Sequence, residues 1–322
     1  MSFQANLESD LLDIVAINDP GKIADLAVLL EYDSVYGQLD AEIEVIDDDT
    51  IKVNGKEIQV YHELDPETLP WGDHNIDIVL ECTGVFRDRE GASKHLKAGA
   101  KKVIISAPGK DSDATFCMGI NTDTYSPGDH NIISNASCTT NGLAPVTMVI
   151  DNEFKIVRGL MTTIHSYTGD QRLTDASHKK DVRRARAAAL NLIPTSTGAA
   201  KAIGVVMPHL EGKLDGVSVR VPTPTVSLVD VVFEVEKETS VEEVNATLEA
   251  AANGPLKGVL DVEHKPLVSM DFKKNPHSSI VDAGMTKVID GNMVKIFAWY
   301  DNEWGYSVRL IEMAAHVGEG LS

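Results

Sequence analysis

A cysteine and a histidine stand where they could serve as a nucleophile and its base. Cys138 begins the apolar stretch "CTTNGLAPVTMVIDNEF", whose pattern predicts a helix with the thiol at its N-terminus. Unpaired N–H groups and aligned dipoles there favour a thiolate, so we expect a lowered Cys138 pKa. His165 ends the strand-like run "GLMTTIHS", where an imidazole could activate that thiol. A small buried cysteine and a hydrogen-bonded strand-end histidine are the alternatives.

Basic residues gather after His165 in an otherwise acidic chain. The stretch "KKDVRRAR" is followed by "TSTG" at 195–198, which predicts a hydroxyl-rich helix start and therefore an anion site. Arg220 lies in an apolar strand-like run, where an unpaired guanidinium would be costly, so we expect an anionic partner there. Two anion sites near one thiol indicate a small phosphorylated carbonyl substrate and a second phosphate. A solvated charged face is the alternative for the basic run.

The elements that must position these residues differ between the two halves of the chain. Up to about residue 136, short β-branched runs alternate with helical segments, which predicts a parallel sheet covered by helices. The stretch around Asn54-Gly55 interrupts this order and predicts an antiparallel hairpin. From Cys138 onward, long alternating strands predict a mainly antiparallel sheet. We therefore expect domains at 1–137 and 138–303, with a C-terminal helix at 304–322 packing on the first.

Composition limits the classes of protein that the chain can belong to. It has 322 residues, a net charge of −20 and no long apolar run or signal peptide, so we expect a soluble cytoplasmic protein without a membrane or nucleic acid as its main partner. The three cysteines, Cys82, Cys117 and Cys138, contain no C-x-x-C pair, which supports neither a disulfide framework nor a zinc site. We predict no metal, and we interpret Cys82 and Cys117 as structural.

Several stretches, in order, carry a resemblance to a known family. They are "AINDP", "YDSVYGQ", "ECTGVF", "KKVIISAPGKD", "NASCTTNGLAP", "TTIHSYTGDQ", "RRARAAALNLIPTSTGAAKA", "VRVPTPTVSLVD" and "WYDNEWGYS". The chain resembles phosphorylating glyceraldehyde-3-phosphate dehydrogenases over essentially its whole length. The resemblance implies a Rossmann-like doubly wound parallel sheet with an α+β catalytic domain. It also implies NAD-dependent oxidative phosphorylation of glyceraldehyde 3-phosphate through a cysteine thioester, and a homotetramer.

The resemblance also implies roles for individual residues. Cys138 is the expected nucleophile and His165 the expected base. The expected contacts of inorganic phosphate and substrate are Ser137, Thr139, Thr197, Gly198 and Arg220, and those of the substrate's own phosphate are Thr168 and Arg184. The expected cofactor contacts are Asp19 for the adenosine ribose, Thr83, Gly84 and Ser106 along the dinucleotide, and Asn302 for the nicotinamide carboxamide.

Two departures from the family pattern leave alternatives open. Ser177 resembles forms that tolerate NADP, whereas the Asp19 carboxylate would repel a 2′-phosphate, so NAD is expected and NADP stays open. The family begins with a strand and a glycine-rich turn before the run "LDIVAIND", and we expect that both are absent here and that neighbouring strands are left unpaired. The alternatives are an erythrose-4-phosphate dehydrogenase, a truncated non-catalytic subunit and a cysteine hydrolase.

Overall fold

The computed structural model describes residues 1–321, and the chain divides into two compact units. Unit 1 contains Met1–Thr115, Tyr125–Asn135 and residues from 310 onward, and unit 2 contains Phe116–Thr124 and Ala136–Arg309. The last helix, α7 (Trp304–Glu319), contributes residues to both units. No helix of residues 1–321 is both long and apolar enough to cross a membrane.

Unit 1 holds two four-stranded sheets, the second of which is wholly parallel as we predicted. The first has the order β1 (Ala16–Asn18), β6 (Lys56–Tyr61), β5 (Thr50–Val53) and β4 (Ile43–Val45), with β1 and β6 parallel. The second is wholly parallel, in the order β7 (Ile78–Glu81), β8 (Lys102–Ile105), β10 (Ile132–Ser134) and β9 (Ala114–Thr115). In the described part of the chain β1 and β7 each pair with a single strand, so both lie at the edges of their sheets. We expected such unpaired edges for strands that lack a neighbour on one side.

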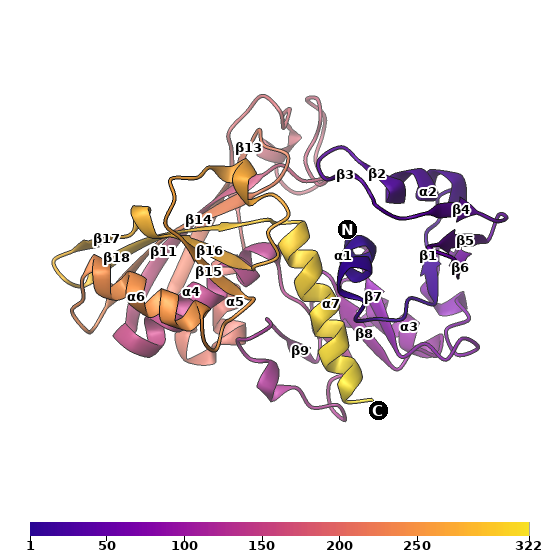
Figure 1. Ribbon diagram of the computed structural model, residues 1–322, viewed down its shortest axis with the longest axis horizontal. Coiled ribbons are helices and arrows are strands. Elements are labelled where there is room, and N and C mark those ends of the chain that lie inside the picture. Colours follow the sequence, from indigo (N-terminus) through magenta and orange to yellow (C-terminus); the bar gives the residue numbers. More distant parts are fainter. Residues whose placement is uncertain (322) are drawn as a thin grey trace. The chain divides into compact units, whose positions relative to one another are not determined.

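The remaining elements of unit 1 confirm the predicted alternation of strands and helices (Figure 1). The β5–β6 hairpin turns at Asn54 and Gly55, whose φ angles of 50° and 81° are those of a two-residue turn that favours this dipeptide. The helices are α1 (Ser2–Ser9), α2 (Ile23–Glu31) and α3 (Arg89–Lys97). A short hairpin joins β2 (Tyr32–Asp33) to β3 (Gly37–Gln38), and 3-10 turns lie at Pro66–Thr68 and, in unit 2, Thr122–Thr124.

One half-buried carboxylate ties the last parallel strands of unit 1 together. Asp113 Oδ2 accepts the N–H groups of Asn131 at 2.8 Å and Ile132 at 2.7 Å, and its Oδ1 pairs with Arg89. Although burial raises the pKa of Asp113, these hydrogen bonds and the Arg89 charge lower it overall. A lowered pKa in the folded state means that the carboxylate stabilises the fold above the ordinary aspartate range, and less as the pH falls through the lowered value.

We therefore expect Asp113→Asn to lower the free energy of unfolding by about 1–3 kcal/mol at neutral pH, the cost of an unmet buried hydrogen bond. The difference from the parent protein should shrink as the pH is lowered below the ordinary aspartate range. Urea unfolding at several pH values measures it. A difference that stays constant down to acid pH would show that the Asp113 charge does not stabilise the fold.

Unit 2 is built on an eight-stranded mixed sheet, mainly antiparallel as predicted. Its order is β12 (Ile193–Ser196), β13 (Leu214–Val221), β11 (Ile156–Ser166), β14 (Ser227–Val235), β18 (Met293–Tyr300), β16 (Ser279–Asp282) and β15 (Leu260–Glu263), with β17 (Lys287–Ile289) also on β18. The β11–β13 and β15–β16 pairs are parallel. The 3-10 turns of this unit also lie at Arg183–Ala185, Pro208–Leu210, Ser269–Phe272 and Ala283–Met285.

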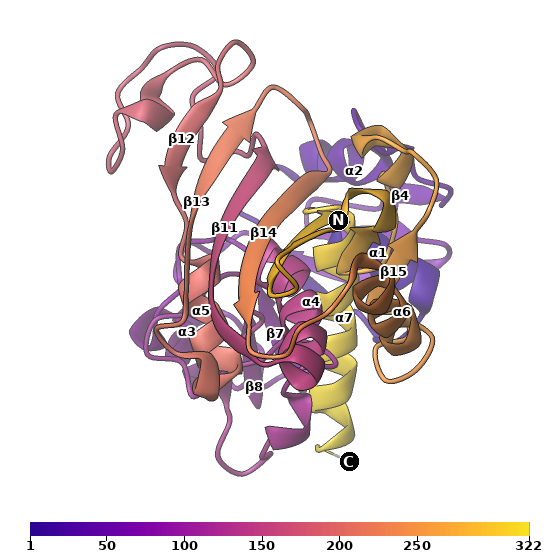
Figure 2. The same cartoon turned by 90° about the vertical axis from the view of Figure 1, so that its left-hand side faces the viewer.

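Three helices pack on one face of this sheet: α4 (Cys138–Phe154), α5 (Ala199–Val206) and α6 (Val241–Ala252). Figure 2 shows β13, β11 and β14 side by side with α5 and α4 behind them. The core between sheet and helices is apolar and includes Leu143, Ile150, Ile203, Phe233 and Ile296. This layer fixes the start of α4 against the ends of the central strands, where the candidate site lies.

Candidate active site

The Cys138 thiol lies at the N-terminus of α4, as predicted. Ser137 is the N-cap residue, and its side-chain oxygen accepts the Thr140 N–H at 3.0 Å. Ala136, just before the cap, has a positive φ of 55°, so the chain turns sharply into the helix. The small residues of "NASC" permit this turn, which fixes the position of the thiol.

His165 and Cys138 are brought together across 27 positions of sequence. The Cys138 Sγ and His165 Nε2 atoms are 3.4 Å apart, and the imidazole is 3% exposed. The other ring nitrogen, Nδ1, is 2.7 Å from the Ser166 carbonyl oxygen, which can only accept. We therefore assign the Nδ1 proton to this contact, which leaves the Nε2 lone pair facing the thiol. A base with this orientation can take the thiol proton.

Arg220 is the residue opposite His165 in the parallel β11–β13 pair. Its Nη1 donates to the Ser166 carbonyl at 3.2 Å and to the Thr168 hydroxyl at 3.1 Å, and lies 2.9 Å from His165 Nδ1. The Arg220 Nε atom is buried and has no hydrogen-bond partner among the described residues. This unsatisfied donor fits the predicted anionic partner.

The electrostatics of the pair differ from our prediction. Burial of its sulfur raises the pKa of Cys138, although the Arg220 charge and hydrogen bonds from Thr139 oppose that rise. Burial and the Arg220 charge lower the pKa of His165 to about 3. The prediction of a lowered Cys138 pKa is therefore wrong, because the helix terminus does not offset the burial. The proton stays on sulfur, and His165 is neutral and able to accept it.

The Arg220 charge should be visible in the reactivity of the thiol. Since the charge lowers the Cys138 pKa, we expect Arg220→Met to slow alkylation of Cys138 by iodoacetamide about tenfold at a fixed pH near 8, the effect of one pKa unit. Mass spectrometry of labelled peptides measures the rate, with the buried Cys117, whose pKa is about 12, as an unreactive internal reference.

The matched control is Arg158→Met. Arg158 lies on the same strand as His165, but its side chain is 74% exposed and pairs with Glu234. This variant should react at the parent rate. Equal alkylation rates in the Arg220 and Arg158 variants would show that the Arg220 charge does not lower the pKa of Cys138.

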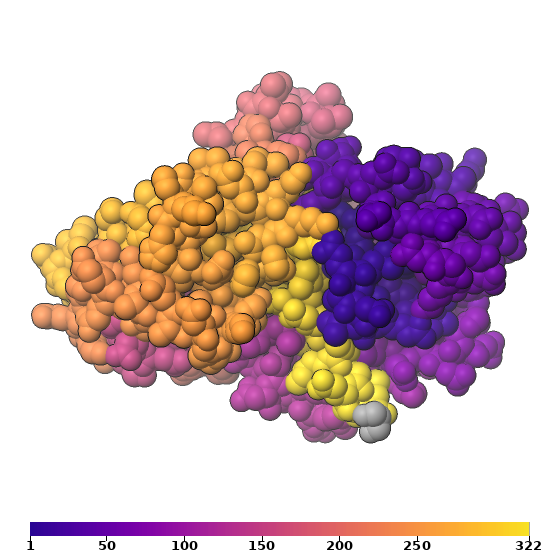
Figure 3. Space-filling view, in the orientation of Figure 1, coloured from indigo at the N-terminus to yellow at the C-terminus, as the bar shows by residue number. Residues whose placement is uncertain are grey.

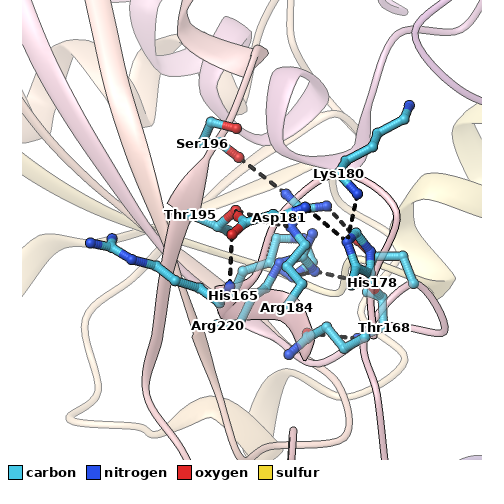
Figure 4. Close-up of polar contacts among 12 residues, drawn as sticks. His165, Thr168, His178, Lys180, Asp181, Arg184, Thr195, Ser196 and Arg220 are labelled. Atoms are coloured by element: carbon cyan, nitrogen blue, oxygen red, sulfur yellow. Dashed lines mark hydrogen bonds and ion pairs between the residues drawn. The ribbon is translucent and has the colours of Figure 1, made fainter. Parts of the chain in front are cut away.

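A second cationic group lies in the segment 167–192, which follows β11 and is seen in pink at the top of the space-filling view (Figure 3). The Arg184 guanidinium donates to the Thr195 hydroxyl at 2.9 Å, to the Ser196 carbonyl at 3.2 Å and to the Asp170 carboxylate. Figure 4 shows Arg184 together with Thr195, Thr168 and Arg220. The structure thus places the predicted anion-binding residues Thr168, Arg184 and Arg220 in one network with His165.

Sequence reasoning missed Asp170, the carboxylate of this network. Thr168 Oγ1 donates to Asp170 Oδ1, and Arg184 pairs with the other oxygen. Burial raises the pKa of Asp170, but the Thr168 hydrogen bond and the charges of Arg220 and Arg184 lower it overall. The signal was present as an acid within "TGDQ", five residues after the strand-end histidine. Asp170 holds the two cationic groups in place at neutral pH.

Tyr300 and Ser227 connect further residues to the site through hydrogen bonds. The buried Tyr300 hydroxyl contacts the Thr139 hydroxyl at 2.9 Å and the Thr163 hydroxyl at 2.8 Å. Ser227 Oγ accepts the Ser166 N–H at 3.1 Å and donates to Asn302 Oδ1 at 2.8 Å. The hydrogen bond from Ser227 holds the amide of the buried Asn302 in a fixed orientation. Sequence reasoning did not identify Tyr300 or Ser227.

The other predicted contacts are at the start of α5 and in unit 1. Thr197 and Gly198 precede α5, where the Thr197 hydroxyl accepts the Ala199 N–H. In unit 1 Asp19 follows β1 and its Oδ1 accepts the Gly21 N–H at 2.7 Å. Thr83 and Gly84 follow β7, and Ser106 follows β8. Asp19, Thr83, Gly84 and Ser106 stand at carboxyl ends of parallel strands, the edge where such sheets bind ligands.

Comparisons with known proteins identify the family. The NAD-binding-domain model of glyceraldehyde 3-phosphate dehydrogenase matches residues 1–89, and the C-terminal-domain model of the same family matches residues 137–302. A glyceraldehyde-3-phosphate dehydrogenase of Geobacillus stearothermophilus is 58% identical over 98% of this chain and 93% of its own length. Glyceraldehyde-3-phosphate dehydrogenase 2 of Nostoc sp. is 55% identical over 97% and 92% of the two chains.

A chloroplastic glyceraldehyde-3-phosphate dehydrogenase A of Chlamydomonas reinhardtii is 57% identical over 95% of this chain and 82% of its own. The matches extend through both units and include the residues of the Cys138–His165 site. The chain belongs to the glyceraldehyde-3-phosphate dehydrogenase family.

Proposed function

We propose that the protein oxidises D-glyceraldehyde 3-phosphate with NAD and inorganic phosphate to 1,3-bisphosphoglycerate, as an NAD-dependent oxidoreductase of glycolysis and gluconeogenesis. The observation that carries the proposal is the Cys138 thiol, held at a helix N-terminus 3.4 Å from Nε2 of His165. A thiol and a base in contact, beside the half-buried cationic groups of Arg184 and Arg220, suit attack on a phosphorylated aldehyde.

The chain's own residues supply the following steps. His165 Nε2 takes the thiol proton as Cys138 Sγ attacks the aldehyde carbon, and the helix N-terminus stabilises the oxyanion that forms. The His165 imidazolium gives this proton to the oxyanion, which forms the thiohemiacetal hydroxyl, and takes it back as hydride leaves, so a thioester on Cys138 remains. Inorganic phosphate attacks the thioester carbon, the C–S bond breaks, and the His165 imidazolium protonates the leaving sulfur, so the acyl phosphate is released with the thiol restored. NAD, when bound, supplies the hydride acceptor.

The anion sites divide between the two phosphates in this proposal. Thr168 and Arg184 hold the phosphate of the substrate, whereas Ser137, Thr197, Gly198 and Arg220 receive inorganic phosphate. The buried Arg220 Nε without a partner supports this assignment, because an anion would satisfy it. Thr139 has a different role from these phosphate contacts. Its hydroxyl is hydrogen-bonded to the Tyr300 hydroxyl, and its hydrogen bonds to the Cys138 sulfur lower the pKa of the thiol.

The residues of unit 1 fit an adenosine group. Asp19 offers one oxygen at the end of β1, since the other accepts the Gly21 N–H, and a free carboxylate oxygen can accept two ribose hydroxyls. Gly84 has a φ of +70° and open space where a Cβ would lie, so a ligand can approach its backbone closely. We propose that unit 1 binds NAD and that Asn302 of unit 2 holds the carboxamide, with NADP use left open by Ser177.

We further propose a cytoplasmic homotetramer. Large apolar side chains are exposed in the segment 167–192 and on the open face of the β11–β13 sheet, a pattern typical of subunit interfaces. They are Leu173, Val182, Leu190 and Leu192, and Leu160 and Val217. Light scattering should report four chains, and Leu190→Asp should lower that number.

An assay at 340 nm with the purified protein tests the reaction. Turnover of glyceraldehyde 3-phosphate should require both NAD and inorganic phosphate, and Cys138→Ser should abolish it. A preference for erythrose 4-phosphate, or oxidation that is independent of phosphate, would contradict the proposal. Ester hydrolysis without NAD would point to a cysteine hydrolase.

A further inference from the structure

A buried carboxylate in unit 1 takes no part in the chemistry proposed above. Glu81 is the last residue of β7, and it is 3% exposed. Its Oε2 lies 2.9 Å from Nε2 of His95, a buried residue of α3. The second nitrogen of His95, Nδ1, lies 3.1 Å from Nε1 of the buried Trp71. We call these three residues the Trp71–His95–Glu81 relay.

The direction of each hydrogen bond in the relay is determined. An indole N–H can only donate, so His95 Nδ1 must accept from Trp71. The proton of the neutral imidazole is then on Nε2, which donates to Glu81. The Trp71 and His95 rings are stacked, with 6.4 Å between centroids and an interplanar angle of 23°, so packing holds the imidazole in this orientation.

The other oxygen of Glu81 holds the residue that follows the strand end. Oε1 accepts the Thr83 N–H at 2.8 Å and also the Thr83 hydroxyl. Although burial raises the pKa of Glu81, hydrogen bonds from His95 and Thr83 lower it overall, so the carboxylate stays ionised at neutral pH and can only accept. Thr83 Oγ1 in turn accepts the Val85 N–H at 3.1 Å.

These contacts leave the Thr83 hydroxyl able to act only as a hydrogen-bond acceptor. A hydroxyl has one donor and two acceptor positions. The donor is used on Glu81 and one acceptor position on Val85, so one acceptor position remains among the described residues. The turn itself is at the surface, with Val85 72% exposed and Gly84 bordered by open space.

We propose that the relay fixes Thr83 as a hydrogen-bond acceptor for the cofactor, so that its hydroxyl contacts a ribose hydroxyl or an amino group of the dinucleotide and not a phosphate oxygen. Phosphate oxygens of a bound dinucleotide carry no proton at neutral pH and would need a donor. The inference rests on the proposed function, in which Thr83 contacts NAD. Glu81, His95 and Trp71 are positioning residues, since they act through Thr83.

A double-mutant cycle on NAD binding tests the coupling between the relay and Thr83. Calorimetry on the full-length protein should show that Thr83→Val and Glu81→Gln each raise the Kd for NAD about fivefold, the worth of one hydrogen bond. In the Thr83→Val background, Glu81→Gln should raise the Kd no further. It should still lower Tm in both backgrounds, because the Glu81–His95 pair is buried.

The matched control is Glu90→Gln, a change of an exposed glutamate in the first turn of α3. It should leave both the Kd and Tm at parent values. If Glu81→Gln lowers Tm but never changes the Kd, or changes the Kd equally with and without Thr83, the relay is only structural and the proposal is overturned.

Ligand analogues identify the group that Thr83 accepts from. With the hypoxanthine analogue of NAD, which lacks the adenine amino group, Thr83→Val should lose its effect if that amino group is the donor and keep it if a ribose hydroxyl is. Both results support the proposal. Weaker binding of inorganic pyrophosphate by Thr83→Val would overturn it, because that ligand offers only acceptors.

Nitrogen-15 NMR of His95 tests the relay without any ligand. The expected neutral tautomer has its proton on Nε2, and a proton on Nδ1 would overturn the relay even if NAD binds normally. If the parent protein binds no NAD while His95 has the expected tautomer, the proposed cofactor binding fails and the hydrogen-bond directions of the relay stand. The two failures are therefore distinguishable.

Discussion

His165→Asn should lower kcat for glyceraldehyde 3-phosphate oxidation by about 10²–10⁴-fold, the usual contribution of a positioned general base. The physical reason for this loss is that the reactive proton is on the Cys138 sulfur in the resting protein. Burial raises the pKa of Cys138 and lowers that of His165 to about 3, so the thiol keeps its proton until the aldehyde is attacked. Without the Nε2 atom 3.4 Å away, the imidazole base that faces the thiol is lost, and an asparagine amide is not basic enough to replace it.

The pH profile separates this role from a structural one. In the variant only the thiolate formed by solvent can react, so the rate should rise with pH through the alkaline range, toward the raised Cys138 pKa. The parent protein should depend less on pH, because its base is already unprotonated above about pH 3. His264→Asn is the control, since His264 is 64% exposed and pairs with Glu249. A His165 variant with more than half of the parent kcat would contradict the assignment of the base.

Arg184→Gln should raise KM for glyceraldehyde 3-phosphate by about 100-fold, with a smaller change in kcat. The Arg184 side chain is 21% exposed, and hydrogen bonds to Thr195 and Ser196 orient it. A hydrogen bond between charged groups contributes about 1.5–3 kcal/mol, which corresponds to about 10–150-fold in affinity. Steady-state kinetics with varied aldehyde measure the effect.

Unphosphorylated glyceraldehyde gives the sharpest comparison for Arg184. If Arg184 binds the substrate phosphate, the variant and the parent should oxidise this aldehyde at similar rates. Arg186→Gln is the matched control, because Arg186 is two positions away, 61% exposed and paired with Asp175. Equal KM increases in the Arg184 and Arg186 variants would rule out a specific phosphate contact for Arg184.

Several features of the fold could be predicted because they depend on neighbouring residues. The Asn54-Gly55 hairpin follows from residues that accept positive φ angles. The start of α4 at Cys138 follows from a serine cap before an apolar helical run. Arg184 and Thr168 could be selected as anion contacts because they stand in recognisable stretches. In each case the signal lies within a few residues of the position predicted.

The sequence by itself determined the family, the alternation of elements, and the residues Cys138 and His165 as candidates. The tertiary structure alone decided how they act. The β11–β13 register places Arg220 beside His165 across 55 positions, and burial there reverses the predicted shift of the Cys138 pKa. The Trp71–His95–Glu81 relay could not be predicted from the sequence either, since its three residues come from a loop, a helix and a strand. Burial and distant pairing depend on how the whole chain packs, and no local pattern encodes them.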